Sequence, residues 1–318
     1  MVELVSVSLS KSSTMNRYFS YTKYFKTSVK HNLSTFALAL LSALFFTSLI
    51  SCNKDIDVPE DGDVVIYKIG GTFSVAADKQ VAFSQGNLQY NAVAHTWRFA
   101  EYQYDCVGAS NASIGSHYDG WIDLFGWGTS GFMIAPYCAS TDVNDYSNNG
   151  EGAEDNNYDW GRFNSISNSI DGARIWRTLS AAEWEYLLQE RENAERKYGL
   201  AVVCDQPGLV LLSDYFSVPA RCTFVPGFEY EFQTNIYNQE QWEKMEAAGA
   251  IFLPAAGYRI GTTVDEVSLY GAYWSSSFGD DGKAYTMGFD IYQISLPLTS
   301  VQAYYGQSVR LVRDVVAN

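Results

Sequence analysis

The C-terminal run from residue 253 to residue 314 constrains the fold more than any other part of the chain. Two pieces of it are typical of a rigid frame: the aromatic and small residues at 271–277, and a β-branched closing strand at 308–312. Between these pieces, after Asp290, lies a run rich in Tyr, Ile, Leu and Thr with almost no charge. We interpret this run as a ligand-facing surface held by the frame. The alternative is a buried core strand with its loop.

Large apolar residues alternate with small or polar residues from 285 to 290. Successive side chains of a strand point to opposite faces, so one set is expected in the core: Tyr285, Met287 and Phe289. The other set is expected to face a ligand: Thr286, Gly288 and Asp290. The alternation fades beyond Asp290, where an exposed loop would form an apolar patch of the kind that marks interaction sites. The residues of that patch are Tyr292, Ile294, Leu296, Leu298, Val301 and Tyr305.

The N-terminal residues have the pattern of an export signal. Residues 17–30 carry four basic residues and no acid, and residues 33–51 carry no charge. The apolar run is also long enough to span a membrane as a helix. Its ending, Leu49-Ile50-Ser51-Cys52, resembles the lipobox of bacterial lipoproteins, in which the Cys is lipidated and becomes the new N-terminus. The resemblance implies a signal peptide at 1–51 and a lipidated tether at 52–62, with Cys52 as the modified residue.

The residues that follow Cys52 are polar and acidic. They resemble the surface-export signal of lipoproteins from the Bacteroidetes. This resemblance implies an outer-membrane protein exposed at the cell surface, where acyl chains insert into the membrane lipid and no helix spans it.

The charge and the aromatic content limit the classes of partner. The formal net charge of −15 argues against nucleic acid and against an anionic membrane surface, because phosphate binding needs clustered Lys and Arg. The chain has 8 Trp and 23 Tyr. These residues are favoured on recognition surfaces, since each combines an apolar body with a polar tip.

The remaining cysteines and the acidic loops leave alternatives open. Four cysteines follow Cys52, namely Cys106, Cys138, Cys204 and Cys222, and no pair has the spacing of a metal or redox motif. They form one or two disulfides in an exported protein, or they are free buried thiols. A long polar segment at 115–165 offers oxygen ligands for calcium, or it is a solvated acidic loop. The candidate calcium ligands are Asp142, Asn144, Asp145, Glu151, Glu154, Asp155 and Asp159.

The residues from 63 to 318 predict one α+β domain. Short strands are expected at 64–67, 72–75 and 81–84, and a hairpin at 86–90 and 96–99. Ser180 and Glu183 form a capping box for a helix that buries Trp184, Leu187 and Leu188, exposes its charged residues including Arg191, and ends at Gly199. Asn238 and Gln241 begin a second helix that buries Trp242 and Met245 and ends at Gly249. Buried strands are expected at 208–212 and 250–254.

The segment at 176–186 resembles a motif of the formylglycine-generating-enzyme/sulfatase-modifying-factor family. The sequence Glu183-Trp184-Glu185-Tyr186 matches that motif completely, whereas Thr178, Ser180 and Ala181 depart from it. The closing residues 308–313 are similar to the final strand of the same family. The resemblance implies a C-type-lectin-like fold, which is an irregular, mixed or antiparallel sheet with two helices and long loops.

The block from residue 253 onward is most similar to the variable proteins of diversity-generating retroelements and to related Bacteroidetes surface lipoproteins. The matching pieces lie at 271–277, 284–289 and 306–310. The resemblance implies a ligand-binding module, with a C-terminal surface that is diversified in that group. The expected binding residues are Tyr270, Ala272, Phe278, Thr286, Gly288, Asp290, Tyr292, Ile294, Leu296, Leu298, Val301 and Tyr305.

The chemistry of an enzyme is not recognisable in the sequence. The enzymes of the resembled family bind copper through a C-terminal pair of cysteines, and this chain has no Cys after Cys222. His95 and His117 lie in no ligand-spaced cluster and in no nucleophile motif. We therefore expect a non-enzymatic surface lipoprotein with no cofactor, which binds a protein or a glycan. The alternatives are a structural or fimbria-associated protein and an enzyme related to sulfatase-modifying factors.

Overall fold

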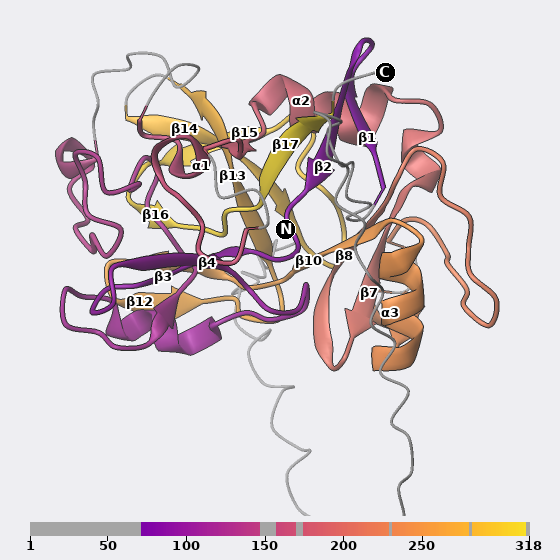
Figure 1. Ribbon diagram of the computed structural model, residues 1–318, viewed down its shortest axis with the longest axis horizontal. Helices are drawn as coiled ribbons and strands as arrows, with labels where there is room; N and C mark the ends of the chain where they lie inside the picture. The colour runs from indigo at the N-terminus through magenta and orange to yellow at the C-terminus, as the bar shows by residue number, and fades with distance from the viewer. Residues whose placement is uncertain (1–70, 147–156, 170–173, 229–230, 280–281, 316–318) are drawn as a thin grey trace, which may run out of the picture. The chain divides into compact units, whose positions relative to one another are not determined.

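A computed structural model of the protein describes residues 71–146, 157–169, 174–228, 231–279 and 282–315 (Figure 1). The chain divides into two compact units, 1–63 and 64–318, and every described residue lies in the second unit. That unit is an α+β fold dominated by β-strands, as the sequence predicts. The predicted signal peptide, Cys52, the tether and the strand at 64–67 lie outside the described residues.

Two four-stranded sheets organise the described chain. The first has the order β1-β2-β17-β6, and its two central strands pair an early segment with the closing one, so that Phe83 lies opposite Val312. The second has the order β10-β8-β7-β9, and β7 and β9 are parallel whereas its other pairs are antiparallel. The strands of these sheets are β1 (Phe73–Ala76), β2 (Lys79–Phe83), β6 (Arg177–Thr178), β7 (Tyr198–Val203), β8 (Gln206–Leu212), β9 (Asn235–Tyr237), β10 (Ala250–Pro254) and β17 (Leu311–Val315).

Three smaller antiparallel sheets complete the strands. Their orders are β13-β14-β15, β12-β11-β16 and β4-β3-β5. The predicted hairpin is confirmed as β3 paired with β4. The strands are β3 (Leu88–Asn91), β4 (Thr96–Phe99), β5 (Trp121–Ile122), β11 (Tyr258–Ile260), β12 (Thr263–Asp265), β13 (Gly271–Phe278), β14 (Lys283–Phe289), β15 (Thr299–Gln302) and β16 (Tyr305–Gly306).

Both predicted helix starts are confirmed as capping boxes. The Ser180 hydroxyl accepts from the backbone N–H of Glu183, whose carboxylate accepts from the N–H of Ser180. Asn238 and Gln241 make the same exchange at the second helix. The helices are α1 (Trp160–Phe163), α2 (Ala181–Glu185) and α3 (Gln239–Ala247); a π-helical turn, η4 (Tyr186–Glu190), continues α2. The 3-10 turns are η1 (Gly108–Ser113), η2 (Val143–Asp145), η5 (Ala194–Arg196) and η6 (Glu231–Thr234).

The first helix is shorter than the sequence predicts. The π-helical turn ends at Glu190, and Gly199 lies inside β7. Arg191, expected on the exposed face, is 3% exposed, and its guanidinium lies 3.3 Å from the carboxylate of Asp214. Arg191 has an extended backbone, with ψ 156°. The helix therefore ends before Arg191, whose side chain is buried in an ion pair with Asp214.

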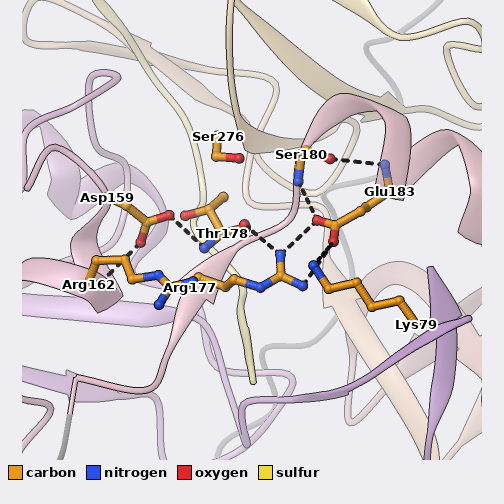
Figure 2. A pocket seen from close by; sticks show the side chains of 8 residues that line it. All are labelled: Lys79, Asp159, Arg162, Arg177, Thr178, Ser180, Glu183 and Ser276. Carbon is orange, nitrogen blue, oxygen red and sulfur yellow. Dashed lines mark hydrogen bonds and ion pairs between the residues drawn. The ribbon is translucent and has the colours of Figure 1, made fainter. Parts of the chain in front are cut away.

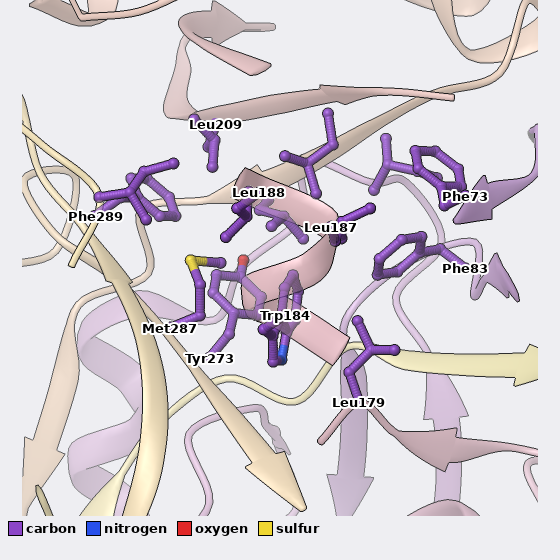
Figure 3. Packing of buried hydrophobic residues seen from close by; sticks show 14 of the residues in the cluster. Phe73, Phe83, Leu179, Trp184, Leu187, Leu188, Leu209, Tyr273, Met287 and Phe289 are labelled. Atoms are coloured by element: carbon purple, nitrogen blue, oxygen red, sulfur yellow. The ribbon is translucent and has the colours of Figure 1, made fainter. Parts of the chain in front are cut away.

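The main core gathers around the inner face of α2 and η4. Trp184, Leu187 and Leu188 are fully buried there, as predicted from their spacing. Figure 3 shows these side chains between Phe73 and Phe83 on one side and the β13–β14 residues on the other, including Met287. The capped helix is thus fixed against the sheet that carries the expected binding segment.

Candidate functional site

The segment at 271–277, expected to be part of a frame, forms a strand that is hydrogen-bonded to neighbouring segments. It lies within β13, and the Trp274 indole donates to the Phe125 carbonyl at 2.7 Å. The Ser275 carbonyl accepts from the Trp127 indole at 2.9 Å. The Ser277 hydroxyl accepts from the first N–H of α2 at 3.0 Å. These contacts tie β13 to a loop on one side and to the capped helix on the other.

The closing segment joins the frame from the other side. Its strand β17 begins at Leu311, three residues later than predicted, while Ser308 forms a bridge with Tyr273. Arg310 is fully buried, and its guanidinium donates to Gln103 at 2.7 Å and to Asn87 at 3.3 Å. Burial lowers the pKa of Arg310 to about 10, so the side chain still carries a proton at neutral pH. Arg310 therefore belongs to the support of the frame.

Three residues expected to face a ligand are buried in the β13–β14–β15 sheet: Ala272, Thr286 and Gly288. The expectation that they face solvent is wrong. Thr286 is 1% exposed, and its hydroxyl lies within hydrogen-bond distance of the Tyr273 carbonyl and the Gln307 side chain. The strands β13 and β15 pair with the two edges of β14, while Gln307 contacts Thr286 on the face expected to be open. The predicted core face is confirmed for Met287 and Phe289, whereas Tyr285 is half-buried.

The loop after Asp290 is folded inward, contrary to the expected exposed patch. Ile294 and Leu298 are 8% and 6% exposed and belong to the main core. Leu296 is half-buried and packs against the same cluster. The Leu298 N–H donates to the carboxylate of Glu185 on α2 at 2.9 Å. The loop is therefore hydrogen-bonded to the helix. Burial of its apolar side chains is more favourable than their exposure to water.

Tyr292 alone among the expected binding residues is highly exposed, at 78%. The carboxylate of Asp290 accepts from the N–H of Tyr292 at 2.7 Å and from that of Gln293 at 3.0 Å. This side-chain turn holds the Tyr292 ring outward. Phe278 and Val301 are half-buried against a second core cluster, and the Phe278 ring lies 4.8 Å from that of Trp127.

Four tyrosines form a connected ring cluster, which we call the tyrosine surface: Tyr258, Tyr270, Tyr304 and Tyr305. The Tyr258 ring lies 6.3 Å from that of Tyr270 and 5.8 Å from that of Tyr305. The Tyr304 and Tyr305 rings stack at 5.3 Å. All four side chains are half-buried, so each presents part of its surface to solvent. The structure thus brings two expected residues, Tyr270 and Tyr305, together through Tyr258.

Tyr258 and Tyr304 were not among the binding residues expected from the sequence, although their rings join the cluster. Tyr258 lies on β11, and Tyr305 lies opposite Ile260 on the neighbouring strand β16. The high Tyr content of residues 253–314 was the signal for this cluster, but it did not indicate which rings meet. That choice depends on the register of β11 against β16.

A glycine and a buried arginine shape the tyrosine surface. A Cβ atom at Gly288 would lie 2.1 Å from the Tyr270 hydroxyl, so only glycine lets this ring lie across β14. Gly306 makes a similar close approach to Arg259. Arg259 is fully buried and donates to the carbonyls of Leu124, Cys138 and Gly261. The backbone beneath the rings is therefore fixed.

The Tyr258 and Tyr270 phenols stay protonated at neutral pH. Burial raises the pKa of Tyr270 above its ordinary value, and the nearby charge of Asp290 raises it further. Burial also raises the pKa of Tyr258, as do the charges of Asp265 and Glu266. These hydroxyls can therefore donate hydrogen bonds beside an acidic rim.

The structure does not bring a metal site together within the described residues. No group of three or more His, Cys, Asp or Glu suited to a metal lies there. Asp142 caps η2 through the N–H of Asn144, and the buried Asp159 caps α1. Glu151, Glu154 and Asp155 lie outside the described residues, while Asp145 is exposed and accepts from the hydroxyl of Ser140.

The described cysteines and histidines form no catalytic grouping. Cys106, Cys138, Cys204 and Cys222 are all free thiols. His95 lies 3.3 Å from the Tyr90 hydroxyl, and His117 lies 2.9 Å from the hydroxyl of its neighbour Ser116.

Among the described residues, no helix has both the length and the apolar character needed to cross a membrane. The chain matches no protein-family model, no curated protein and no solved structure.

Proposed function

We propose that the chain is a surface-anchored, non-enzymatic binding module of C-type-lectin-like fold that recognises its ligand through the tyrosine surface. The observation that supports this most is the linked cluster of Tyr258, Tyr270 and Tyr305 on a fixed backbone. Tyr side chains supply large contact area at low cost in conformational entropy, because each has only two rotatable side-chain bonds. The ligand is a protein or a glycan outside the cell.

The charges around the cluster define what this ligand offers. The tyrosine hydroxyls are neutral donors, and Asp265, Glu266 and Asp290 act on them electrostatically. An acidic rim repels anions and favours neutral or basic groups. A glycan with neutral hydroxyls, or a protein patch with Lys or Arg beside an apolar centre, fits both features.

Replacing Tyr258 with Ala is expected to weaken ligand binding by about 30-fold, which corresponds to about 2 kcal/mol for a central aromatic anchor. Tyr258 is the ring that links Tyr270 to Tyr305, so its removal interrupts the surface. The purified protein would first be screened against printed glycans and extracellular proteins. Affinities of the hits would then be measured by surface plasmon resonance for the wild type and the variant.

Tyr215→Ala is the matched control for this experiment. Tyr215 is 88% exposed but lies outside the tyrosine surface, so its removal is expected to leave the affinity unchanged. An equal loss of affinity in both variants, or unchanged affinity in Tyr258→Ala, would assign the ligand to another surface.

Anchoring is proposed to depend on acylation of Cys52. The variant Cys52→Ser is expected to incorporate no fatty acid and to leave the membrane fraction, because its hydroxyl cannot form the thioether that carries the lipid. Metabolic labelling with an alkyne fatty acid, followed by fractionation, measures both effects. Label retained by Cys52→Ser would show that the lipid lies elsewhere or that the anchor is of another kind.

A further inference from the structure

A polar pocket of about 380 Å³ opens where three separate parts of the chain meet, and none of the tyrosine surface lines it. Its cationic side chains are Lys79 from β2, Arg162 from α1 and Arg177 from β6 (Figure 2). Asp159 and Glu183 also line it. Asp314 is a third acid beside the pocket, 2.6 Å from Arg177 and 3.8 Å from Lys79. The cations and acids are therefore equal in number, and an anion would depend on N–H donors that the acids leave unused.

The two acids of the pocket are already engaged by the protein. Glu183 receives two hydrogen bonds from Arg177, at 2.7 and 2.9 Å, and one from the Ser180 N–H at 2.9 Å. Asp159 accepts from the backbone N–H groups of Gly161 at 3.0 Å and Thr178 at 2.8 Å. These carboxylates therefore have little capacity left to accept hydrogen bonds from a ligand.

The remaining capacity of the pocket is mostly that of donors. Lys79 lies 2.9 Å from Glu183, its side chain is 42% exposed, and its ammonium group has three N–H bonds. The Arg162 side chain is exposed at the rim. Arg177 is held in place by Glu183 and by Asp314, at 2.6 Å from the latter. Its five N–H groups are taken by Glu183, Asp314 and the Thr178 carbonyl, so Arg177 adds only charge to the pocket wall.

A second, smaller recess shares residues with the pocket and contains a buried donor. This recess of about 10 Å³ is lined by Trp160 and shares Asp159, Thr178 and Ser276 with the main pocket. Trp160 is 1% exposed, and its indole N–H has no hydrogen-bond partner among the described residues. An unsatisfied buried donor costs free energy, which an acceptor entering the recess would recover.

The backbone N–H groups at positions 181 and 183 of α2 are not available to a ligand in this pocket. The first N–H of α2 is taken by the Ser277 hydroxyl, and the N–H of Glu183 is taken by that of Ser180. Recognition would have to come from the side chains around the pocket.

We propose that this pocket binds a small oxyanion group, a carboxylate, sulfate or phosphate, through Arg162, Lys79 and the Trp160 indole. Arg177 provides positive charge at the wall of the pocket. The anion would be a free ion or the acidic substituent of a larger molecule, such as a sulfated or uronic-acid sugar. This site accepts the charge that the acidic rim of the tyrosine surface repels.

The test is isothermal titration of the full chain with sodium sulfate, inorganic phosphate and sodium acetate at constant ionic strength, with chloride as the reference anion. At least one oxyanion is expected to bind saturably at one site. Arg162→Gln is expected to weaken that binding about tenfold, because it removes a charge-assisted donor. Glucuronate and a sulfated monosaccharide, compared with the free ions, distinguish an acidic sugar from an inorganic ion as the ligand.

Arg196→Gln is the matched control, since Arg196 is 77% exposed and its ion-pair partner is the neighbouring Glu195. Its affinity for the oxyanion is expected to equal that of the wild type. The proposal is overturned if no oxyanion binds more tightly than chloride, or if Arg162→Gln and Lys79→Gln both bind as the wild type does. Tyr258→Ala is expected to retain oxyanion binding, so failure of this proposal and failure of the proposed function are separable.

Discussion

Replacing Trp274 with Ala is expected to lower the free energy of unfolding by about 3–5 kcal/mol, the range for truncating a buried Trp. Trp274 is fully buried in the second core cluster, and its indole donates to the Phe125 carbonyl at 2.7 Å. Both the cavity and the lost hydrogen bond contribute to the expected loss. Urea unfolding of the purified protein, followed by far-ultraviolet circular dichroism, measures it.

Trp274→Phe separates these two contributions. Phenylalanine keeps most of the aromatic volume but lacks the N–H, so a loss of only about 1–2 kcal/mol is expected. The Phe125 carbonyl also accepts from the N–H of Gln307 at 2.9 Å and stays hydrogen-bonded in either variant. If Trp274→Ala lost no more stability than Trp274→Phe, the packing of the Trp274 ring would not support β13.

Replacing Arg177 with Met is expected to cost about 3–5 kcal/mol at pH 7, the range for removing one partner of a buried ion pair. The Arg177 and Glu183 side chains are only 9% and 12% exposed. Without Arg177, Glu183 keeps only Lys79 as a cationic partner within 4 Å among the described residues. The exposed pair partner Arg196 supplies the control, since Arg196→Met is expected to change stability by no more than about 0.5 kcal/mol.

The pKa values of the acids paired with Arg177 determine how this loss of stability changes with pH. Burial disfavours the charged form of Glu183, but hydrogen bonds from Arg177 and Lys79 outweigh it and hold its pKa below the usual value. The pKa of Asp314 is lowered in the same way, against burial, by Arg177. A carboxylate with a lowered folded-state pKa contributes stability that is complete above its unfolded pKa, about 4, and is lost as the pH falls through the folded pKa.

The difference in free energy of unfolding between wild type and Arg177→Met should therefore become smaller between about pH 5 and pH 2. The decrease should be close to the free energy that the Arg177 ion pairs contribute at pH 7. Urea unfolding at a series of pH values across this range measures the difference. A gap that stayed constant with pH would mean that Arg177 acts through packing of its aliphatic stem and not through its charge.

Sequence alone determined the features that depend on neighbours within about one helical turn. The capping boxes at Ser180 and Asn238 are set by residues three positions apart. The burial of Trp184, Leu187 and Leu188 follows from their spacing on one helical face. The strand at 271–277 was found in the same way, because its small and aromatic residues suit a packed strand.

Only the tertiary structure decided which surfaces meet solvent. Alternation along β14 divided its side chains into two faces correctly, but the Gln307 side chain contacts Thr286 on the face expected to be open. Glu185 binds the N–H of Leu298 from 113 positions away and folds the apolar loop inward. Tyr258 meets Tyr270 and Tyr305 because of strand register. A sequence pattern shows which side chains share a face, whereas exposure of that face depends on distant segments that compete to cover it.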